Sequence, residues 1–277
     1  MRAGMTWSYR VMPISELNTR QKAEGIARLF RERRQMDMLP PELMPSSLDE
    51  AYSVRQIFEE IEIAGRGAVA GYKIGLTTSI MQQLCGVDEP VYGAIFGNEV
   101  HHGRAELAGR NYCRLGIETE IALRLGQDLP LGGTRGSWRD RVAGAVDSCM
   151  AAIELLEDLH HDYGRLSAAA MVAGNVWNAG IVVGAPVSDW HRLDLTQLTA
   201  RLSINGREIG NGKGGDVMGN PLNALAWLAE ARAVAGTPLR RGMIVMTGSM
   251  VPIQFPSAGD RATVEVEGLG SAELVVT

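Results

Sequence analysis

Cysteines, surplus basic charge and long apolar runs are all scarce in this 277-residue sequence. The three cysteines (Cys85, Cys113 and Cys149) lie far apart and form no C-x-x-C pair, so neither a zinc site nor a disulfide framework is expected. The net charge of −5 argues against a nucleic-acid partner, because phosphate binding needs a concentrated basic surface. No run approaches the ~18 apolar residues of a spanning helix, so we expect no membrane association.

Several sequence motifs with known chemistry are also missing. The first twenty residues lack the apolar core of a signal peptide, and we therefore expect a cytoplasmic protein. The histidine pairs at 101–102 and 160–161 lack the spacing of an H-E-x-x-H zinc site, and no G-x-S-x-G elbow occurs. The glycine-rich stretch 210–215 matches no Walker or dinucleotide motif, and it predicts either a flexible active-site loop or a plain turn.

The first quarter of the chain has the pattern of helices. Residues 15–36 carry apolar side chains at spacings that fall on one helix face. Ser47 and Glu50 form an S-x-x-E capping box ahead of a second apolar stripe. We therefore divide the chain into a helical N-terminal region, residues 1–68, and a β-rich catalytic core, residues 69–277.

Beyond residue 69 the pattern changes to short strands. Two helices interrupt them, one over roughly 137–150 and one that begins at Asn220 and runs to about Ala235. Asn205-Gly206 predicts a two-residue hairpin. Strands in irregular order with occasional helices indicate an α+β fold with a mixed β core. The predicted strands cover residues 69–75, 117–125, 151–157, 178–184, 199–204, 243–248 and 262–276.

Two glutamates spaced two apart form the first candidate site. Glu118 and Glu120 lie in an apolar segment, and side chains two apart on a strand share a face. Two neighbouring carboxylates repel, which favours a proton or a hard cation such as Mg²⁺. However, the same alternation describes a strand with one solvated face, and Glu265 and Glu267 repeat the spacing near the C-terminus. The spacing alone leaves both interpretations open.

Two further charged residues lie in apolar surroundings. Glu154 falls within the apolar run 152–156, where an acid is costly unless it is paired or bound to a metal. Alternatively, Glu154 lies on the polar face of a helix continuing from residue 138. Lys73 lies in a glycine-punctuated apolar strand. It is either snorkelling at an edge, which the residues alone favour, or held in a site where a lowered pKa would allow acid–base catalysis.

An ordered set of segments covers about residues 48–277. They are 72–77, 86–93, 118–122, 152–154, 219–228, 247–252 and 258–260. In this order they resemble the 2-keto-4-pentenoate hydratase and 4-oxalocrotonate decarboxylase group of the fumarylacetoacetase superfamily.

The resemblance implies a fold and a site. The fold would be a fumarylacetoacetase-like mixed β-sheet core, of the β-roll or sandwich kind, with a helical N-terminal region. Glu118, Glu120 and Glu154 would hold a divalent cation, Mg²⁺ or Mn²⁺, and Lys73 would be the catalytic lysine. The substrate-binding residues implied are Leu76, Thr77, Asn175, Thr247 and Ser249.

The resemblance also implies an activity. A metal-dependent hydratase would add water to a 2-hydroxy-2,4-dienoate, a small unsaturated 2-oxo acid in its enol form, during catabolism of aromatic ring-cleavage products. The alternatives are a 4-oxalocrotonate-type decarboxylase, a carbon–carbon bond hydrolase and an inactive partner subunit. The segment 247–252 favours the hydratase. We expect the chain to form a homo-oligomer, as the family does. It could also form a complex with a related hydratase or decarboxylase or with another enzyme of the pathway.

The sequence departs from the family pattern at four places. Val91 replaces a usual aspartate, and Leu159 stands where an arginine is common. Gly174 and Trp177 alter the usual Ala-Asp-Asn-Ala-Ser segment. We expect these changes to reshape the walls of the substrate pocket.

Overall fold

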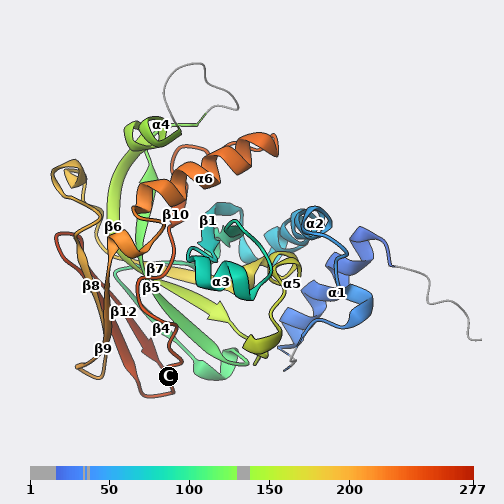
Figure 1. Cartoon of the computed structure of the whole chain (residues 1–277). Helices are drawn as coiled ribbons and strands as arrows, with labels where there is room; N and C mark the ends of the chain where they lie inside the picture. The colour runs from blue at the N-terminus through green and yellow to red at the C-terminus, as the bar shows by residue number, and fades with distance from the viewer. Residues whose placement is uncertain (1–16, 34, 36–37, 130–137) are drawn as a thin grey trace, which may run out of the picture.

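The computed structural model describes residues 17–33, 35, 38–129 and 138–277, and it contains two mixed β-sheets with helices around them (Figure 1). The larger sheet has the order β2 (Val91–Phe96), β1 (Val69–Gly75), β10 (Ile244–Met246), β5 (Leu115–Leu125), β6 (Val146–Glu157), β7 (Asn178–Val183) and β3 (Val100–His102). The smaller has the order β4 (Arg104–Leu107), β12 (Gly270–Val276), β11 (Arg261–Val266), β8 (Thr199–Ile204) and β9 (Arg207–Lys213). The predicted α+β fold with a mixed β core is confirmed.

The helices form two groups around the sheets (Figure 1). α2 (Leu48–Arg66) contacts both α1 (Thr19–Glu32) and α5 (Ala168–Ala173), and these three lie on one side of the molecule. α4 (Trp138–Ala145) packs against α6 (Pro221–Val234), and the short α3 (Ser79–Leu84) follows β1. None of the helices in the described ranges has both the length and the apolar character needed to cross a bilayer.

The N-terminal helices begin close to where the sequence predicts them. The helix predicted over 15–36 occupies Thr19–Glu32, and residues 15, 16, 34 and 36 lie outside the described part of the chain. Only half of the predicted capping box forms. Ser47 Oγ accepts from Glu50 N, but the Glu50 carboxylate accepts from Ser46 and Lys22 instead of the Ser47 backbone.

The predicted helix over 137–150 is too long. Within the described residues it begins at Trp138 and ends at Ala145, and the chain continues directly into β6. In β6 nearly every side chain is buried, as expected of a strand covered on both faces. An apolar run of this kind has no period that separates strand from helix. The alternative that placed Glu154 on a continuing helix is therefore wrong.

Two other predictions need correction at the C-terminal end. The strand predicted over 262–276 is a hairpin of β11 and β12, which pair antiparallel. The glycine-rich stretch 210–215 is not a free loop, because it begins inside β9. A Cβ on Gly212 would lie 2.0 Å from the carbonyl oxygen of Met250. Glycine there allows two backbones to approach closely, which a flexible-loop interpretation does not require.

One close backbone approach positions the strand that carries Lys73. β1 pairs parallel with β10, with Gly71 opposite Ile244 and Lys73 opposite Met246. A Cβ on Gly71 would lie 1.8 Å from the carbonyl oxygen of Ile244. Only glycine fits this contact without moving one of the two strands. β10 in turn pairs with β5, so β1 and β5 lie on either side of one short strand.

Candidate metal centre and active site

Three glutamates converge from two neighbouring strands. Glu118 and Glu120 lie on one face of β5, and Glu154 on β6 is directly opposite Glu118 in the antiparallel register. One carboxylate oxygen from each lies within 4.8 Å of the others. By contrast, Glu265 and Glu267 have the same spacing but are exposed to solvent. The E-x-E pattern forms a cluster only where a third carboxylate faces it.

Lys73 is buried in contact with this cluster. Its side chain is 3% exposed, and its Nζ lies 3.0 Å from Glu154 Oε1. The snorkelling interpretation is therefore wrong. Burial alone lowers the pKa of Lys73, but the three neighbouring carboxylates, Glu154 foremost, raise this pKa above its ordinary value. The lowered pKa that burial suggested is not found, because the neighbouring carboxylates favour the charged form of Lys73.

The carboxyl groups themselves resist ionisation together. Burial raises the pKa of Glu118 to about 7, with Lys73 opposing the shift and Glu154 adding to it. Burial, followed by the charges of Glu154 and Glu118, raises the pKa of Glu120 well above its ordinary value. Low dielectric surroundings and like charges disfavour the ionised forms, as electrostatics requires. A cation at the centre of the three groups would relieve both effects.

Two carboxylate oxygens have no donor among the described residues. Glu120 Oε2 accepts from Gly248 N at 2.8 Å, and Glu154 Oε1 accepts from Asn178 Nδ2 at 3.1 Å. The second oxygen of each, Glu120 Oε1 and Glu154 Oε2, is buried without a hydrogen-bond partner. A buried acceptor left unpaired is costly, and carboxylate oxygens are the ligands that hard divalent cations prefer. The donor set therefore fits a divalent cation.

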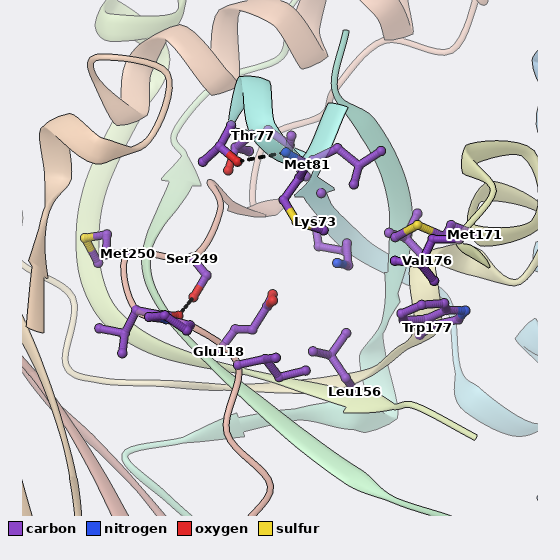
Figure 2. A pocket seen from close by; sticks show the side chains of 18 of the residues that line it. Lys73, Thr77, Met81, Glu118, Leu156, Met171, Val176, Trp177, Ser249 and Met250 are labelled. Carbon is purple, nitrogen blue, oxygen red and sulfur yellow. Dashed lines mark hydrogen bonds between the residues drawn. The ribbon is translucent and has the colours of Figure 1, made fainter. Parts of the chain in front are cut away.

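A cavity of about 520 Å³ opens next to the cluster. Figure 2 shows Lys73 and Glu118 pointing into it, with Ser249 on one side of them and Trp177 on the other. Glu120 and Glu154 are fully buried beside these two groups. The cavity thus has a charged inner end, where a small acid could meet both the lysine and a cation.

The structure separates the implied substrate-binding residues into two groups. Leu76, Thr77 and Ser249 line the cavity. Asn175 and Thr247 do not, because their side chains bind backbone groups. Asn175 accepts from Ala94 N at 2.6 Å and donates to Ala94 O at 2.9 Å. Thr247 Oγ1 donates to the carbonyl of Ile121 at 2.8 Å.

Some residues of the site were not found from the sequence. Asn178 and Gly248 bind the glutamates, although Gly248 lies in a segment that was singled out. Tyr163, Met171 and Asp216 line the cavity. Their segments carry no spacing pattern that predicts convergence. A polar residue opening an apolar strand, as Asn178 opens β7, was the one available signal.

Of the four departures from the family pattern, only Trp177 lines the cavity among the described residues. Val91 and Leu159 are buried in the core, and Gly174 packs against α1, where a Cβ would lie 3.0 Å from the Phe30 ring. The expectation that all four reshape the pocket walls is therefore too broad. The buried carboxylate of Asp158, next to Leu159, contacts Arg114 from another segment.

The chain is similar in sequence to several known proteins. The model of the fumarylacetoacetate (FAA) hydrolase C-terminal family matches residues 98–277. A 2-keto-4-pentenoate hydratase of Paraburkholderia phymatum is 34% identical over 221 residues, 80% of this chain and 83% of the relative. A 2-hydroxyhexa-2,4-dienoate hydratase of Comamonas testosteroni is 29% identical, covering 83% of this chain and 87% of the relative.

The chain belongs to the fumarylacetoacetate hydrolase family. The resemblance to the hydratase and decarboxylase group is thereby confirmed. Among solved structures of this fold, 4-oxalocrotonate decarboxylase from Pseudomonas putida G7, complexed with magnesium and adipate, has a TM-score of 0.84 at 24% identity. The superposition covers 94% of this chain and 97% of that one, and at this identity it shows the fold.

Removing one carboxylate of the cluster should remove metal binding. We expect Glu120→Gln to weaken Mn²⁺ binding, measured by calorimetric titration, by more than about 100-fold. Loss of a hydrogen bond that only supports a metal ligand costs roughly 10–100-fold in affinity, and loss of the ligand itself should cost more. Glu265→Gln removes the same charge from the exposed E-x-E pair and should leave the affinity unchanged. Equal affinities in the two variants would contradict the assignment of the cluster as a metal site.

The raised pKa of Glu118 should make stability depend on pH. The pKa of Glu118 is about 7 in the folded chain, above its ordinary value of 4.5. Between these two pH values the folded chain keeps a proton on Glu118, whereas the unfolded chain has released it. The free energy of unfolding of the EDTA-treated protein should therefore fall as pH rises from 5 to 8. Urea unfolding measures this, and saturating Mg²⁺ or the Glu118→Gln change should flatten the slope. A wild-type slope identical to that of Glu118→Gln would exclude this origin.

Proposed function

We propose that this protein is a metal-dependent hydratase that adds water to a 2-hydroxy-2,4-dienoate and yields a 4-hydroxy-2-oxo acid. The observation that carries the proposal is the convergence of Glu118, Glu120 and Glu154 with Lys73 at the charged end of the cavity. Relatives named 2-keto-4-pentenoate hydratase and 2-hydroxyhexa-2,4-dienoate hydratase support this reaction. A role in the catabolism of aromatic ring-cleavage products follows from that substrate class.

We assign Glu118, Glu120 and Glu154 as the residues that would hold Mg²⁺ or Mn²⁺. When all three are ionised, their charge exceeds that of Lys73 by two, which a divalent cation balances. A bound cation would supply Lewis acidity toward the carboxylate and 2-oxygen of the substrate. The unpaired oxygens of Glu120 and Glu154 support this assignment.

Lys73 is the proposed catalytic residue. Ketonisation moves the proton of the 2-hydroxyl to C5, and conjugate addition then places the oxygen of water on C4 and its proton on C3. As an ammonium fixed by Glu154, Lys73 would donate a hydrogen bond to the 2-oxygen and stabilise the negative charge that develops there as the 2-hydroxyl gives its proton to water, from which a proton returns to C5. Leu76, Thr77 and Ser249 would bound the substrate, while Asn175 and Thr247 would act by positioning the backbone behind it.

One observation favours the hydratase over the decarboxylase reaction. Among the described residues that line the cavity, Lys73 is the single basic side chain, and Glu154 pairs with it. A 2-oxo-3-enedioate, the decarboxylase type of substrate, would bring a second carboxylate. Burying that charge without a partner is costly. A monocarboxylate with an uncharged tail fits the lining better.

Other parts of the proposal rest on the sequence and the family. We propose the division into a helical region, residues 1–68, and a catalytic core, residues 69–277, with β1 beginning at Val69. We also propose that the protein forms a homo-oligomer in the cytoplasm. This oligomer could associate with a related hydratase, a decarboxylase or another enzyme of the pathway. The converging charges at Lys73 and Glu154 favour an active enzyme over an inactive partner subunit, which needs no such cluster.

Two substrates separate the competing reactions. With Mg²⁺ present, we expect loss of the absorbance of 2-hydroxypenta-2,4-dienoate and formation of the 4-hydroxy-2-oxo acid. With a 2-oxo-3-hexenedioate, kcat/KM for CO₂ release should be at least about 100-fold lower than kcat/KM for hydration of the dienoate. The reason is that leaving a buried charge unpaired costs about 3 kcal/mol or more. Faster CO₂ release than hydration would make the protein a decarboxylase.

A lysine variant tests the proposed catalytic role. Lys73→Met keeps much of the side-chain volume, and we expect kcat for hydration to fall by about 10²–10⁴-fold. Mn²⁺ affinity, measured by calorimetry, should not weaken, since removing a positive charge beside the glutamates favours a cation. Wild-type turnover in Lys73→Met, or turnover lost only in proportion to metal, would refute the role.

A further inference from the structure

The cavity has an apolar end opposite its charged end. We define the apolar end by five side chains that line the cavity: Leu156, Leu166, Met171, Val176 and Trp177. Figure 2 shows Met171, Val176 and Trp177 grouped on one side of Lys73 and Leu156 between them and Glu118, with the serine and methionine of the loop after β10 on the other side. The two ends therefore differ in chemistry as well as position.

The volume of the cavity exceeds what a minimal dienoate needs. At about 520 Å³ it lies in the range of roughly 300–1,000 Å³ that pockets for drug-sized ligands occupy. A five-carbon dienoate is a much smaller molecule. With its carboxylate and 2-oxygen at Glu118 and Lys73, it would leave the apolar end unfilled. Apolar surface of this kind gains binding energy only when an apolar group covers it.

The backbone at the apolar end is strained in a way that fixes its side chains. Asn175, Val176 and Trp177 have φ values of 56°, 49° and 59°. This left-handed region is rarely adopted by bulky residues, and least by β-branched ones such as valine. Such strain persists only where surrounding contacts hold it, and it clusters at ligand sites.

Contacts on both sides hold this strained segment. The Asn175 side chain bonds both backbone groups of Ala94 in β2. The Trp177 ring packs on His161 with 4.4 Å between ring centroids, and Tyr163 meets it edge-on at 6.2 Å. These contacts leave Val176 and Trp177 facing the cavity, as Figure 2 shows. The segment is built to present an apolar wall.

We propose that the natural substrate carries an uncharged apolar substituent, alkyl or aryl, beyond C5 of the dienoate, and that the apolar end binds it. This inference rests on the proposed function, because the glutamate cluster and Lys73 must hold the other end of the same molecule. It names a substrate class that the hydratase reaction alone does not specify. Leu166, Val176 and Trp177 are its specificity-determining residues.

A substrate series tests the inference on the Mg²⁺-loaded enzyme. The series is 2-hydroxypenta-, 2-hydroxyhexa- and 2-hydroxyocta-2,4-dienoate. Each buried methylene is worth about a fourfold rise in kcat/KM, so the octadienoate should exceed the pentadienoate on the order of 50-fold. Equal or falling kcat/KM along the series, with the pentadienoate hydrated well, would overturn the inference and leave the proposed function intact.

A charge placed at the apolar end should reverse the preference. Leu166 is half-buried, and Leu166→Arg should lower kcat/KM for the octadienoate at least tenfold while improving it for a dienoate that ends in a second carboxylate. Ile80→Arg is the matched control, since Ile80 is 76% exposed and lies outside the cavity lining. If Leu166→Arg does not fold, Leu166→Ala should still reduce the rise in kcat/KM that each added methylene of the substrate gives. An unchanged series in Leu166→Ala overturns the inference.

Binding of unreactive acids separates this inference from the proposed function. On the Mn²⁺-loaded protein, calorimetry should give 2-oxooctanoate at least tenfold tighter binding than pyruvate, and Leu166→Arg should remove the difference. If 2-oxooctanoate binds more tightly while no dienoate is hydrated, binding of a tail at the apolar end is supported and the hydratase proposal fails. If both acids bind equally well, binding of a tail at the apolar end is refuted, whatever the enzyme hydrates.

Discussion

Burying three carboxylates and one ammonium together is the constraint on which the rest of this molecule depends. In a low-dielectric interior each charge needs a partner, and the cluster obtains most of its partners from the protein. Lys73 pairs with Glu154, and the Gly248 backbone and Asn178 donate to two of the glutamates. Within the described part of the chain, Glu120 Oε1 and Glu154 Oε2 stay buried without a hydrogen-bond partner. A small divalent cation that prefers oxygen ligands would satisfy them.

Strand pairing in the larger sheet brings these charged side chains together. Antiparallel pairing of β5 and β6 places Glu118 opposite Glu154, and the short β10 carries β1 close enough for Lys73 to reach them. Much of the remaining cavity wall comes from other segments and is apolar, although Thr77, Tyr163, Asp216 and Ser249 also line it. Under the proposed function, the reacting group and the tail of a substrate would be recognised by separate parts of the chain.

The sequence predicts the parts of this site that depend on local pattern. The shared face of Glu118 and Glu120 follows from strand alternation, and the helical N-terminal region from spacing and caps. Glu154 could not be assigned to strand or helix, because β6 is buried on both faces and has no period. The burial of Lys73 depends on pairing with residues more than 80 positions away. Likewise, nothing local indicates that Asn175 binds the backbone of β2.

The placement of β10 has a consequence for how the chain matures on the ribosome. β10 spans Ile244–Met246 and lies between β1 and β5, so these two strands gain their shared neighbour only when nearly the whole chain has been synthesised. Until then β1, which carries Lys73, lacks the strand that joins it to β5 and its two glutamates. Such long-range pairing is slow to form. The proposed cation site would therefore gain its lysine only late in synthesis.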